Sequence, residues 1–520
     1  MAIFLLPGFG RRQPLGVGTN IITRAAMRSR RHHRRKWQVQ ELWPLLRGAA
    51  FILLWLIGLQ HTASAQNARL RVSESGRYLL QGAEGKPFFY LADTVWNMVH
   101  ILNREDMRLY LDHRAANEFN VVFFSAISER GGNGPNAYGD KPFVDDDFLH
   151  PAVTPGDDPN DPEQYDFWDH LDFFLHECAR RGIYAAMNPI YASWYVRDGH
   201  VTQANAEEFG RFWGRRYGSN PNIIWVLGGD IAPDFKPEHL EIHRRMARGI
   251  ALGATGKEDY SMLLMTYHPP GQSKAPWART SSKWYHEEHW LDFNMLQTGQ
   301  ADYSSYDLVN ADYQRRPVKP VLDGEPWYEA HPHKIRPGNR LASDFDVRKR
   351  AYWSVFAGAC GHTYGEGSVM LLWSPGQAAF RDTEVVPWKQ ALDRKGGLQM
   401  KFLRRLIESR PMLDRVPDQS LLAYDAMEFN DRIQVIRGND YAMIYSTSGN
   451  RIDIHLGRIS GANVRAWWFD PRDGSAKEIG VFPNKGSREF QPPSTGIGHD
   501  WVLVLDDATR QFAPPGVRLP

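Results

Sequence analysis

Two carboxylates in this chain each follow a short apolar segment, and together they could perform acid and nucleophile chemistry. Residues 222–229 are apolar and β-branched up to Asp230, and residues 320–324 lead in the same way to Glu325. Such segments are typical of strands buried on both faces of a parallel sheet. Cleavage of a glycosidic bond needs two carboxyl groups close together, one as proton donor and one as nucleophile or base. The alternative is structural: Asp230 would cap the next helix, and Glu325 would join an ion pair.

The two carboxylates can act together only if the fold brings both strand ends to one place. Candidate strands alternate with helical patterns of roughly ten to fifteen residues, an order typical of parallel βαβ units. Eight such strands indicate an α/β fold of the (β/α)8 or TIM-barrel type, in which functional groups sit at the C-terminal strand ends. The predicted strands are residues 87–93, 119–125, 183–188, 222–229, 261–267, 295–298, 320–324 and 361–364. The predicted helices are residues 104–118, 167–181, 207–217, 237–252, 346–359 and 389–408.

After Pro411 the sequence changes to short strands separated by turn residues such as Gly438-Asn439 and Pro471-Arg-Asp-Gly474. This pattern predicts an all-β sandwich, preceded by a barrel domain over residues 66–410 and extending over residues 411–520. Successive strand residues point to opposite faces, so at most one of Trp467 and Trp468 is expected to face solvent. The predicted sandwich strands are residues 433–437, 441–445, 453–456, 464–469 and 501–505, and a small hairpin over residues 70–81 precedes the barrel.

Residues 1–65 have the order of a secretory signal. A basic stretch over residues 28–36 precedes an apolar run over residues 45–59, and Ala63-Ser-Ala65 provides a small-residue cleavage pattern. The run is shorter than the ~20 residues that span a bilayer comfortably. We therefore expect a secreted or periplasmic protein that begins at Gln66, without stable membrane association; an uncleaved anchor is the alternative.

The charge balance argues against a nucleic-acid partner. The chain has 62 Lys and Arg against 60 Asp and Glu, but the leader accounts for ten of the basic residues and only one acid, Glu41. The rest of the chain is therefore net acidic and lacks the basic bias that nucleic acid attracts. The two cysteines, Cys178 and Cys360, lie in apolar settings and are expected to be buried thiols rather than a disulfide.

Five motifs, taken together and in order, resemble the apiosidase-like glycoside hydrolases of family 140. They are Leu91-Ala-Asp-Thr-Val-Trp96, Asn222-Ile-Ile-Trp-Val-Leu-Gly-Gly-Asp230, Asp323-Gly-Glu-Pro-Trp-Tyr328, Gly361-His-Thr-Tyr-Gly365 and Ala466-Trp-Trp-Phe-Asp-Pro-Arg-Asp-Gly474. The resemblance covers residues 68–506 and implies a barrel followed by a collagen-binding-like sandwich. It also implies a retaining β-glycosidase acting on pectin side chains, with the acid/base at Asp230 and the nucleophile at Glu325. The wider barrel clan has Asn-Glu where this chain has Gly229-Asp230, and a shorter acid needs a closer backbone.

Polar and aromatic residues at the other strand ends are expected to bind substrate on the same rim. Asp93 would hold sugar hydroxyls and Trp96 would stack on a sugar; the alternatives are a helix cap for Asp93 and a core tryptophan for Trp96. Trp327 would form the floor of a subsite. The remaining candidates are Asn188, Tyr191, Trp194, Tyr267, His268, Gln297, His362 and Tyr364.

No metal or other cofactor is expected. His331 and His333 lie beyond the seventh strand, whereas a metal-dependent barrel hydrolase usually carries such a pair at the first strand. His286 and His289 have a spacing of three residues, not the four of a zinc-binding helix.

The leading hypothesis is a secreted retaining glycoside hydrolase acting on an oligo- or polysaccharide. A retaining enzyme would hold its carboxyl groups ~5–5.5 Å apart, and the acid would have a raised pKa. One alternative is a non-catalytic carbohydrate- or matrix-binding protein with a relic barrel. Another is a metal-dependent barrel hydrolase. The sequence leaves open the sugar and whether cleavage is internal or terminal.

Overall fold

The structure is a computed structural model that describes residues 68–519 except 128–132, 235, 272–278, 302, 336–337 and 381–382. The predicted signal segment lies outside the described residues. Within the described ranges, no helix has the length and apolar character needed to cross a membrane.

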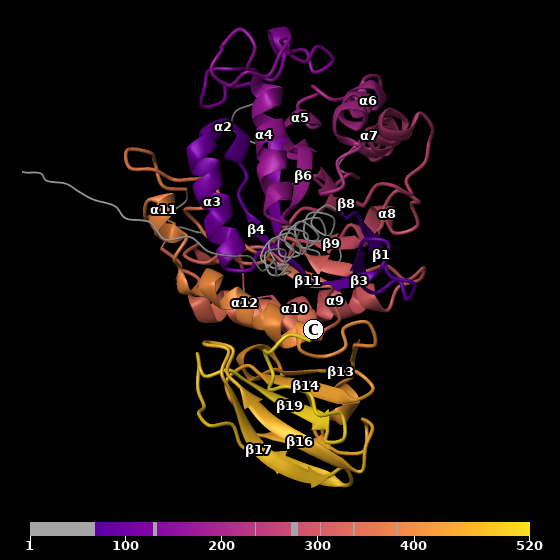
Figure 1. Ribbon diagram of the computed structural model, residues 1–520, viewed down its shortest axis with the longest axis vertical. Coiled ribbons are helices and arrows are strands. Elements are labelled where there is room, and N and C mark those ends of the chain that lie inside the picture. The colour runs from indigo at the N-terminus through magenta and orange to yellow at the C-terminus, as the bar shows by residue number, and fades with distance from the viewer. Residues whose placement is uncertain are drawn as a thin grey trace, which may run out of the picture. The chain divides into compact units, whose positions relative to one another are not determined.

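Eight parallel strands form a barrel sheet in the order β8-β7-β6-β5-β4-β11-β10-β9 (Figure 1). The two ends of the sheet approach each other, because the Asp292 N–H donates to the Met265 carbonyl and the Thr266 hydroxyl donates to the Phe293 carbonyl. Each strand lies within or next to its predicted range, so the predicted barrel is confirmed. The strands are β4 (Tyr90–Thr94), β5 (Val121–Ile127), β6 (Tyr184–Ile190), β7 (Ile223–Gly228), β8 (Met265–His268), β9 (Asn294–Leu296), β10 (Val321–Asp323) and β11 (Gly361–Tyr364).

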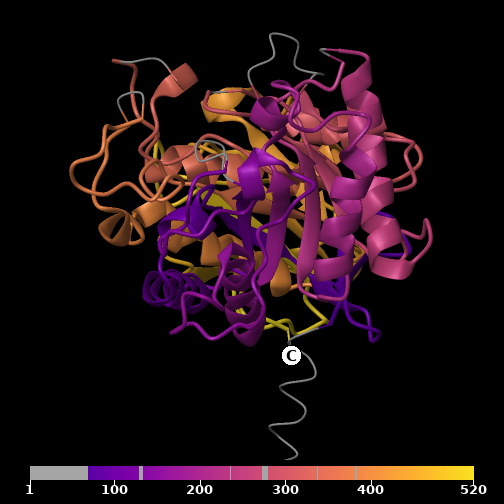
Figure 2. The same cartoon turned by 90° about the horizontal axis from the view of Figure 1, so that it is seen from above.

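Helices between the strands cover the outside of the sheet, and Figure 2 shows α6 and α7 side by side. Capping residues fix several helix starts: Asp166 and Ser343 each form a capping box, and the Asn103 side chain accepts the Asp106 N–H. The predicted helices correspond to α3 (Arg104–Ala116), α4 (Phe167–Arg180), α6 (Ala206–Tyr217), α7 (Glu238–Thr255), α10 (Asp344–Phe356), and α11 (Trp388–Ala391) with α12 (Lys395–Glu408). Helices that the sequence did not predict are α2 (Met98–Ile101), α5 (Ala192–Tyr195), α8 (Ser282–Tyr285) and α9 (Ser305–Tyr313).

The single helix predicted over residues 389–408 is interrupted before α12. Arg394 has extended backbone dihedrals, and its guanidinium lies 3.4 Å from the buried Glu366 carboxylate. The Gly396 N–H donates to Glu329. These contacts replace the helical hydrogen bonds that the sequence pattern alone would predict.

Side chains of the barrel strands alternate between the barrel interior and the surrounding helices. Tyr90 and Ala92 of β4 belong to the interior apolar cluster, whereas Leu91 belongs to the cluster behind the sheet. Phe123, Val226 and other members of the neighbouring strands join the interior cluster. This alternation decides which strand-end residues reach the barrel mouth.

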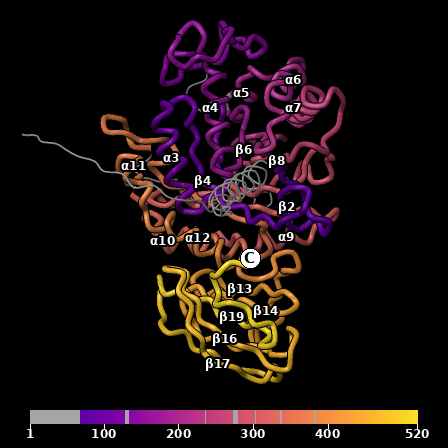
Figure 3. Tube along the Cα trace, viewed as in Figure 1, coloured from indigo at the N-terminus to yellow at the C-terminus, as the bar shows by residue number. Residues whose placement is uncertain are grey.

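A C-terminal β-sandwich follows the barrel (Figure 3). Its larger sheet has the order β12-β13-β14-β19-β16-β17, and its smaller sheet pairs β15 with β18. The sequence did not predict β17, none of whose side chains is fully buried and whose residues lack regular apolar alternation. The strands are β12 (Val416–Pro417), β13 (Ile433–Arg437), β14 (Tyr441–Ser446), β15 (Ile452–His455), β16 (Asn463–Phe469), β17 (Ala476–Pro483), β18 (Ser487–Phe490) and β19 (Trp501–Asp507). The predicted N-terminal hairpin is also present and forms a small sheet of β1 (Leu70–Val72), β2 (Leu79–Gln81) and β3 (Lys86–Phe88).

The sandwich shares an apolar cluster and buried ion pairs with the barrel helices. Arg348 on α10 pairs with Asp500 at 2.6 Å, and Arg410 after α12 pairs with Asp506 through two hydrogen bonds of 2.7 Å. Trp467 packs in the shared cluster, while Trp468 packs in the sandwich core. Each is only 7% exposed, in agreement with the prediction that at most one faces solvent. Cys178 and Cys360 are buried free thiols, as predicted.

These buried ion pairs predict that the sandwich stabilises the barrel. Asp506→Ala would leave the fully buried Arg410 without its carboxylate and should lower the free energy of unfolding by ~3–5 kcal/mol. The matched control is Asp453→Ala, which removes a partner of the exposed Arg451 and should cost less than ~1 kcal/mol. Urea denaturation of the full chain measures both values. Equal effects would show that the buried pair is not stabilising.

Candidate active site

Asp230 and Glu325 lie together at the C-terminal ends of β7 and β10. One oxygen of each carboxylate and one ring nitrogen of His268, the last residue of β8, all lie within 4.8 Å of one another. The fold therefore brings together the two carboxylates that the sequence singled out. His268, one of the predicted rim residues, lies beside them.

A left-handed turn carries Asp230 to this position. Gly228, Gly229 and Asp230 have φ values of 87°, 124° and 48°, a backbone region that L-residues with side chains rarely adopt. A Cβ on Gly228 would lie 2.6 Å from the His268 carbonyl oxygen, so the approach of β8 also requires glycine. The Asn188 amide donates to the Gly228 carbonyl at 2.9 Å, and the Gly229 N–H donates to the His268 carbonyl. The turn supplies the close backbone that a short acid needs.

The Asp230 carboxylate has a raised affinity for a proton. Although the residue reaches solvent, protein atoms surround its carboxylate closely. Burial removes water from around the carboxylate and, together with the negative charge of Glu325, raises the pKa of Asp230 to about 6. Neighbouring His268 and hydrogen bonds from Gln297 and Tyr191 act in the opposite direction.

Glu325 is 7% exposed and is held by its neighbours. Its Oε2 lies 3.0 Å from His268 Nε2, and its Oε1 lies 3.5 Å from the Gln300 amide nitrogen. Burial lowers the pKa of His268 to about 4, against the opposing charge of Asp230, so the imidazole is neutral near pH 7. A neutral imidazole does not form a strong ion pair with Glu325.

Five predicted rim residues surround the carboxylate pair. Tyr191 and Gln297 contact Asp230, His268 contacts Glu325, and Asn188 holds the turn through Gly228. Trp96 packs edge-on against His268 and is only 4% exposed, so it offers a sugar little ring surface. For Trp96, the alternative of a core tryptophan fits this environment better than stacking.

Asp93, His362 and Tyr364 lie behind the barrel sheet, away from the pair. Asp93 is fully buried and accepts hydrogen bonds of 2.6 Å from Arg114 and Tyr110 on α3. In the β4–β11 register, Tyr364 pairs with Asp93 and His362 with Leu91, so all of them face outward. Their predicted roles as sugar ligands do not fit these positions.

Tyr267 and Trp327 also make hydrogen bonds that support the protein structure, and neither side chain is placed to contact a substrate. The Tyr267 hydroxyl donates to the Ile231 carbonyl at 2.8 Å, so it supports the turn that carries Asp230 from outside the barrel. Trp327 is fully buried and donates to the His331 carbonyl, so it does not form a subsite floor. The Trp194 side chain lies outside the described residues.

The sequence reasoning missed Tyr328 and Gln300. Burial, followed by the charge of Glu325, raises the pKa of the Tyr328 hydroxyl, which places this ring beside the pair. Residues 325–328 follow β10 and do not continue it, so strand alternation could not show whether Trp327 or Tyr328 faces the pair. Gln300 approaches Glu325 from the segment after β9, and no sequence pattern marked it.

Asp230, His268 and Glu325 also form the one cluster of three possible metal ligands found among the described residues. Carboxylate oxygens and an imidazole nitrogen would suit a divalent cation. The same donor set serves proton transfer equally well, so the geometry alone leaves the metal-dependent alternative open.

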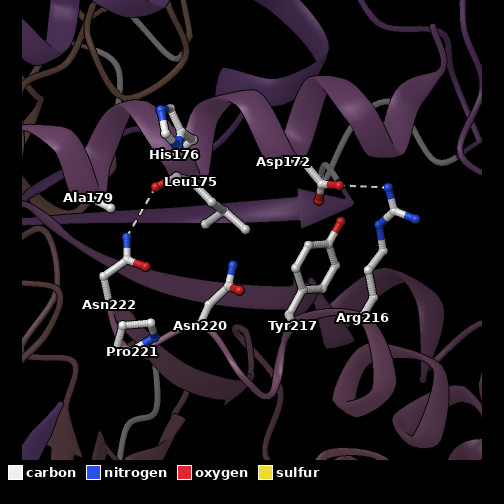
Figure 4. Close-up of a pocket in the computed structure, with 9 residues that line it drawn as sticks. All are labelled: Asp172, Leu175, His176, Ala179, Arg216, Tyr217, Asn220, Pro221 and Asn222. Carbon is white, nitrogen blue, oxygen red and sulfur yellow. Dashed lines mark hydrogen bonds and ion pairs between the residues drawn. The ribbon is translucent and has the colours of Figure 1, made fainter. Parts of the chain in front are cut away.

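A separate cavity of about 370 Å³ lies at the opposite end of β7 (Figure 4). Asn222, just before the strand, donates to the Leu175 carbonyl there, and Arg216 pairs with Asp172 at 2.7 Å. Functional groups of barrels sit at the other strand ends, so this cavity is not the candidate active site.

Two family profiles match the chain, and both agree with the predicted fold and enzyme class. The profile described as "Apiosidase-like, catalytic domain" matches residues 73–414, and the profile described as "Putative collagen-binding domain of a collagenase" matches residues 416–506. No curated protein matches the chain.

Two solved structures resemble nearly the whole described chain. A glycoside hydrolase family 5 structure from Bacteroides vulgatus is 36% identical with a TM-score of 0.78, covering 88% of this chain and 97% of that one. A structure described as "Glycoside hydrolase" is 34% identical with a TM-score of 0.77, covering 86% of this chain and 98% of its own.

The raised pKa of Asp230 predicts a measurable coupling between the carboxylates. Glu325→Gln removes a negative charge, so the pKa of Asp230 should fall below about 6 while the contribution of burial remains. Carbon-detected NMR titration of the Asp230 carboxyl measures this shift. Glu366→Gln, at a buried carboxylate hydrogen-bonded to the Ser368 and Val369 N–H groups, is the control and should leave it unchanged. An unaltered Asp230 pKa in Glu325→Gln would disprove the coupling.

Proposed function

The chain belongs to the apiosidase-like family of glycoside hydrolases, and we propose that it cleaves β-glycosidic bonds in plant or microbial polysaccharide with retention of configuration. Glu325 is the proposed nucleophile and Asp230 the proposed acid/base. The observation that carries the proposal is the approach of the two carboxylates to within 4.8 Å. Retaining glycosidases hold these groups ~5–5.5 Å apart, whereas inverting enzymes leave ~6.5–9.5 Å for a water molecule. Pectin side chains are a candidate substrate, because the family resemblance implies them.

The proposed reaction has two steps. Glu325 attacks the anomeric carbon as the glycosidic C–O bond breaks, and Asp230 transfers its proton to the departing oxygen. Asp230, now ionised, removes a proton from water, which attacks the same carbon and releases the sugar from Glu325. Once Glu325 is esterified its charge is gone, which lowers the pKa of Asp230 and suits its change from acid to base.

Two alternatives remain distinguishable. A relic barrel that only binds carbohydrate would not need a protonated acid beside an ionised glutamate, and the raised pKa of Asp230 favours catalysis. A metal-dependent hydrolase would use Asp230, His268 and Glu325 as ligands, and it would lose turnover in a chelator. The direct screen compares the full chain with Glu325→Gln on β-linked plant and bacterial oligosaccharides.

For the nucleophile, we expect Glu325→Ala to abolish turnover and azide to restore it with an inverted product. The shortened side chain leaves room for the anion to attack from the face that the carboxylate occupied. Product analysis by NMR measures the configuration, and Asp172→Ala in the remote cavity is the control that should keep normal turnover. Undiminished activity in Glu325→Ala would exclude its proposed role.

For the acid/base, Asp230→Ala should slow substrates with poor leaving groups by ~10²–10⁴-fold and activated aryl glycosides much less. The catalytic form carries a proton on Asp230, so kcat/KM of the unaltered protein should fall as pH rises above about 6. This basic limb should disappear in Asp230→Ala. Equal losses on both substrate types would assign the proton donor elsewhere.

Secretion is part of the proposal, supported by the basic, apolar and small-residue order of residues 1–65. N-terminal sequencing of the exported protein should begin at Gln66. A membrane fraction that retains residues 45–59 would show that this segment is an uncleaved anchor.

A further inference from the structure

His268 has a fully buried side chain that points at the carboxylate pair. Its Nε2 lies 3.0 Å from the Glu325 Oε2, yet neither ring nitrogen forms a hydrogen bond with another of the described residues. Buried polar atoms are nearly always hydrogen-bonded, because a buried polar atom without a partner costs free energy. This imidazole therefore has the position and the available nitrogen of a ligand-binding group.

Aromatic neighbours hold the His268 ring in this orientation. Phe123, Trp96 and Tyr191 surround the imidazole, with ring centroids 5.5, 5.7 and 6.2 Å from its own. The backbone is fixed as well, since the His268 carbonyl accepts the Gly229 N–H. A ligand whose rotamer is fixed by packing loses little entropy when an ion binds to it.

The three donor atoms have the spacing of a small metal site. One oxygen of Asp230, one oxygen of Glu325 and one nitrogen of His268 lie within 4.8 Å of one another. Zinc binds nitrogen and oxygen ligands at ~2.0–2.2 Å, so neighbouring ligands of a tetrahedral ion lie ~3.4 Å apart. Small side-chain rotations would bring the set to that spacing. Because Asp230 is exposed, an ion can enter from solvent.

The donor types favour zinc over magnesium or calcium. An imidazole nitrogen beside carboxylate oxygens suits Zn²⁺, whereas Mg²⁺ and Ca²⁺ prefer six or more oxygen ligands. Three protein ligands, with a fourth position left to water, are sufficient for a zinc ion. A divalent cation would also relieve the repulsion between the two carboxylates.

We propose that Asp230, His268 and Glu325 bind one Zn²⁺ reversibly, and that the bound ion inhibits the protein instead of serving it as a cofactor. The binding follows from the geometry, whereas the inhibition rests on the proposed function. The ion coordinates a carboxylate oxygen of Glu325, the proposed nucleophile, and takes the place of the proton on Asp230. Zinc and substrate therefore exclude each other.

Isothermal titration calorimetry of the metal-free full chain with zinc chloride tests the binding. His268→Gln keeps a polar side chain but removes the ligand nitrogen. It should weaken one equivalent of zinc binding by at least the ~10–100-fold that loss of a ligand's supporting partner costs. Glu325→Gln has nearly the same shape as the native side chain and should show the same loss, so the test does not depend on how well His268→Gln packs.

His150→Gln is the matched control. His150 is exposed and lies 2.7 Å from Asp147, so it is a histidine–carboxylate pair on the surface, outside the site. Its replacement should leave the zinc equivalent unchanged. No zinc binding by the unaltered chain, or binding that survives in both His268→Gln and Glu325→Gln, would overturn the site.

The inhibition is tested on a glycoside that the unaltered protein cleaves. Zinc should raise KM and leave kcat unchanged, magnesium at the same concentration should change neither, and EDTA should restore full turnover. Zinc that binds without raising KM would overturn the inhibition. Turnover that EDTA abolishes and zinc restores would also overturn it, because the ion would then be a cofactor.

The calorimetry separates this proposal from the proposed function. If the unaltered protein cleaves no glycoside, the proposed function fails, while the metal site is still judged by zinc binding. One equivalent that is lost in both His268→Gln and Glu325→Gln supports the site in that case, and its absence overturns it.

Discussion

The repulsion between the Asp230 and Glu325 carboxylates is the constraint around which the candidate site is built. Two negative charges within 4.8 Å disfavour each other, and a proton on Asp230 relieves the repulsion. Burial and the charge of Glu325 raise the pKa of Asp230 and so favour a proton there, while the buried His268 beside Glu325 stays neutral. In the proposed mechanism, this difference in environment lets one carboxyl group act as the acid and the other as the nucleophile.

Holding this pair requires rigid support from several elements. The left-handed turn at Gly228 and Gly229 is fixed from inside by Asn188 and from outside by the Tyr267 hydroxyl at Ile231. On the Glu325 side, Ser354 of α10 lies 3.4 Å from Asp323, two residues before the glutamate. The same helix carries Arg348, which pairs with Asp500 of the sandwich. The sandwich therefore stabilises the helix that packs behind the strand of the proposed nucleophile.

The sequence predicted the barrel strands and the carboxylate pair well, because apolar runs and strand-end acids are local signals. It did not predict which way strand-end residues point, since this depends on the register between neighbouring strands. Asp93 illustrates the limit: its position at the end of β4 was recognised, but pairing with Arg114 on α3 shows that it faces outward. Tyr364 shares that direction through its register with Asp93. Strand β17 escaped prediction because none of its side chains is fully buried, although Ile479 and Phe482 pack partly against the sandwich core.

The stereochemistry of the first product tests the central claim most directly. Proton NMR recorded in the first minutes of turnover distinguishes the anomer released by the enzyme from the mixture that forms later in water. A retaining reaction through Glu325 predicts that a β-glycoside first yields the β-anomer. Release of the α-anomer first would contradict the account, because it would require direct attack by water instead of a bond to Glu325.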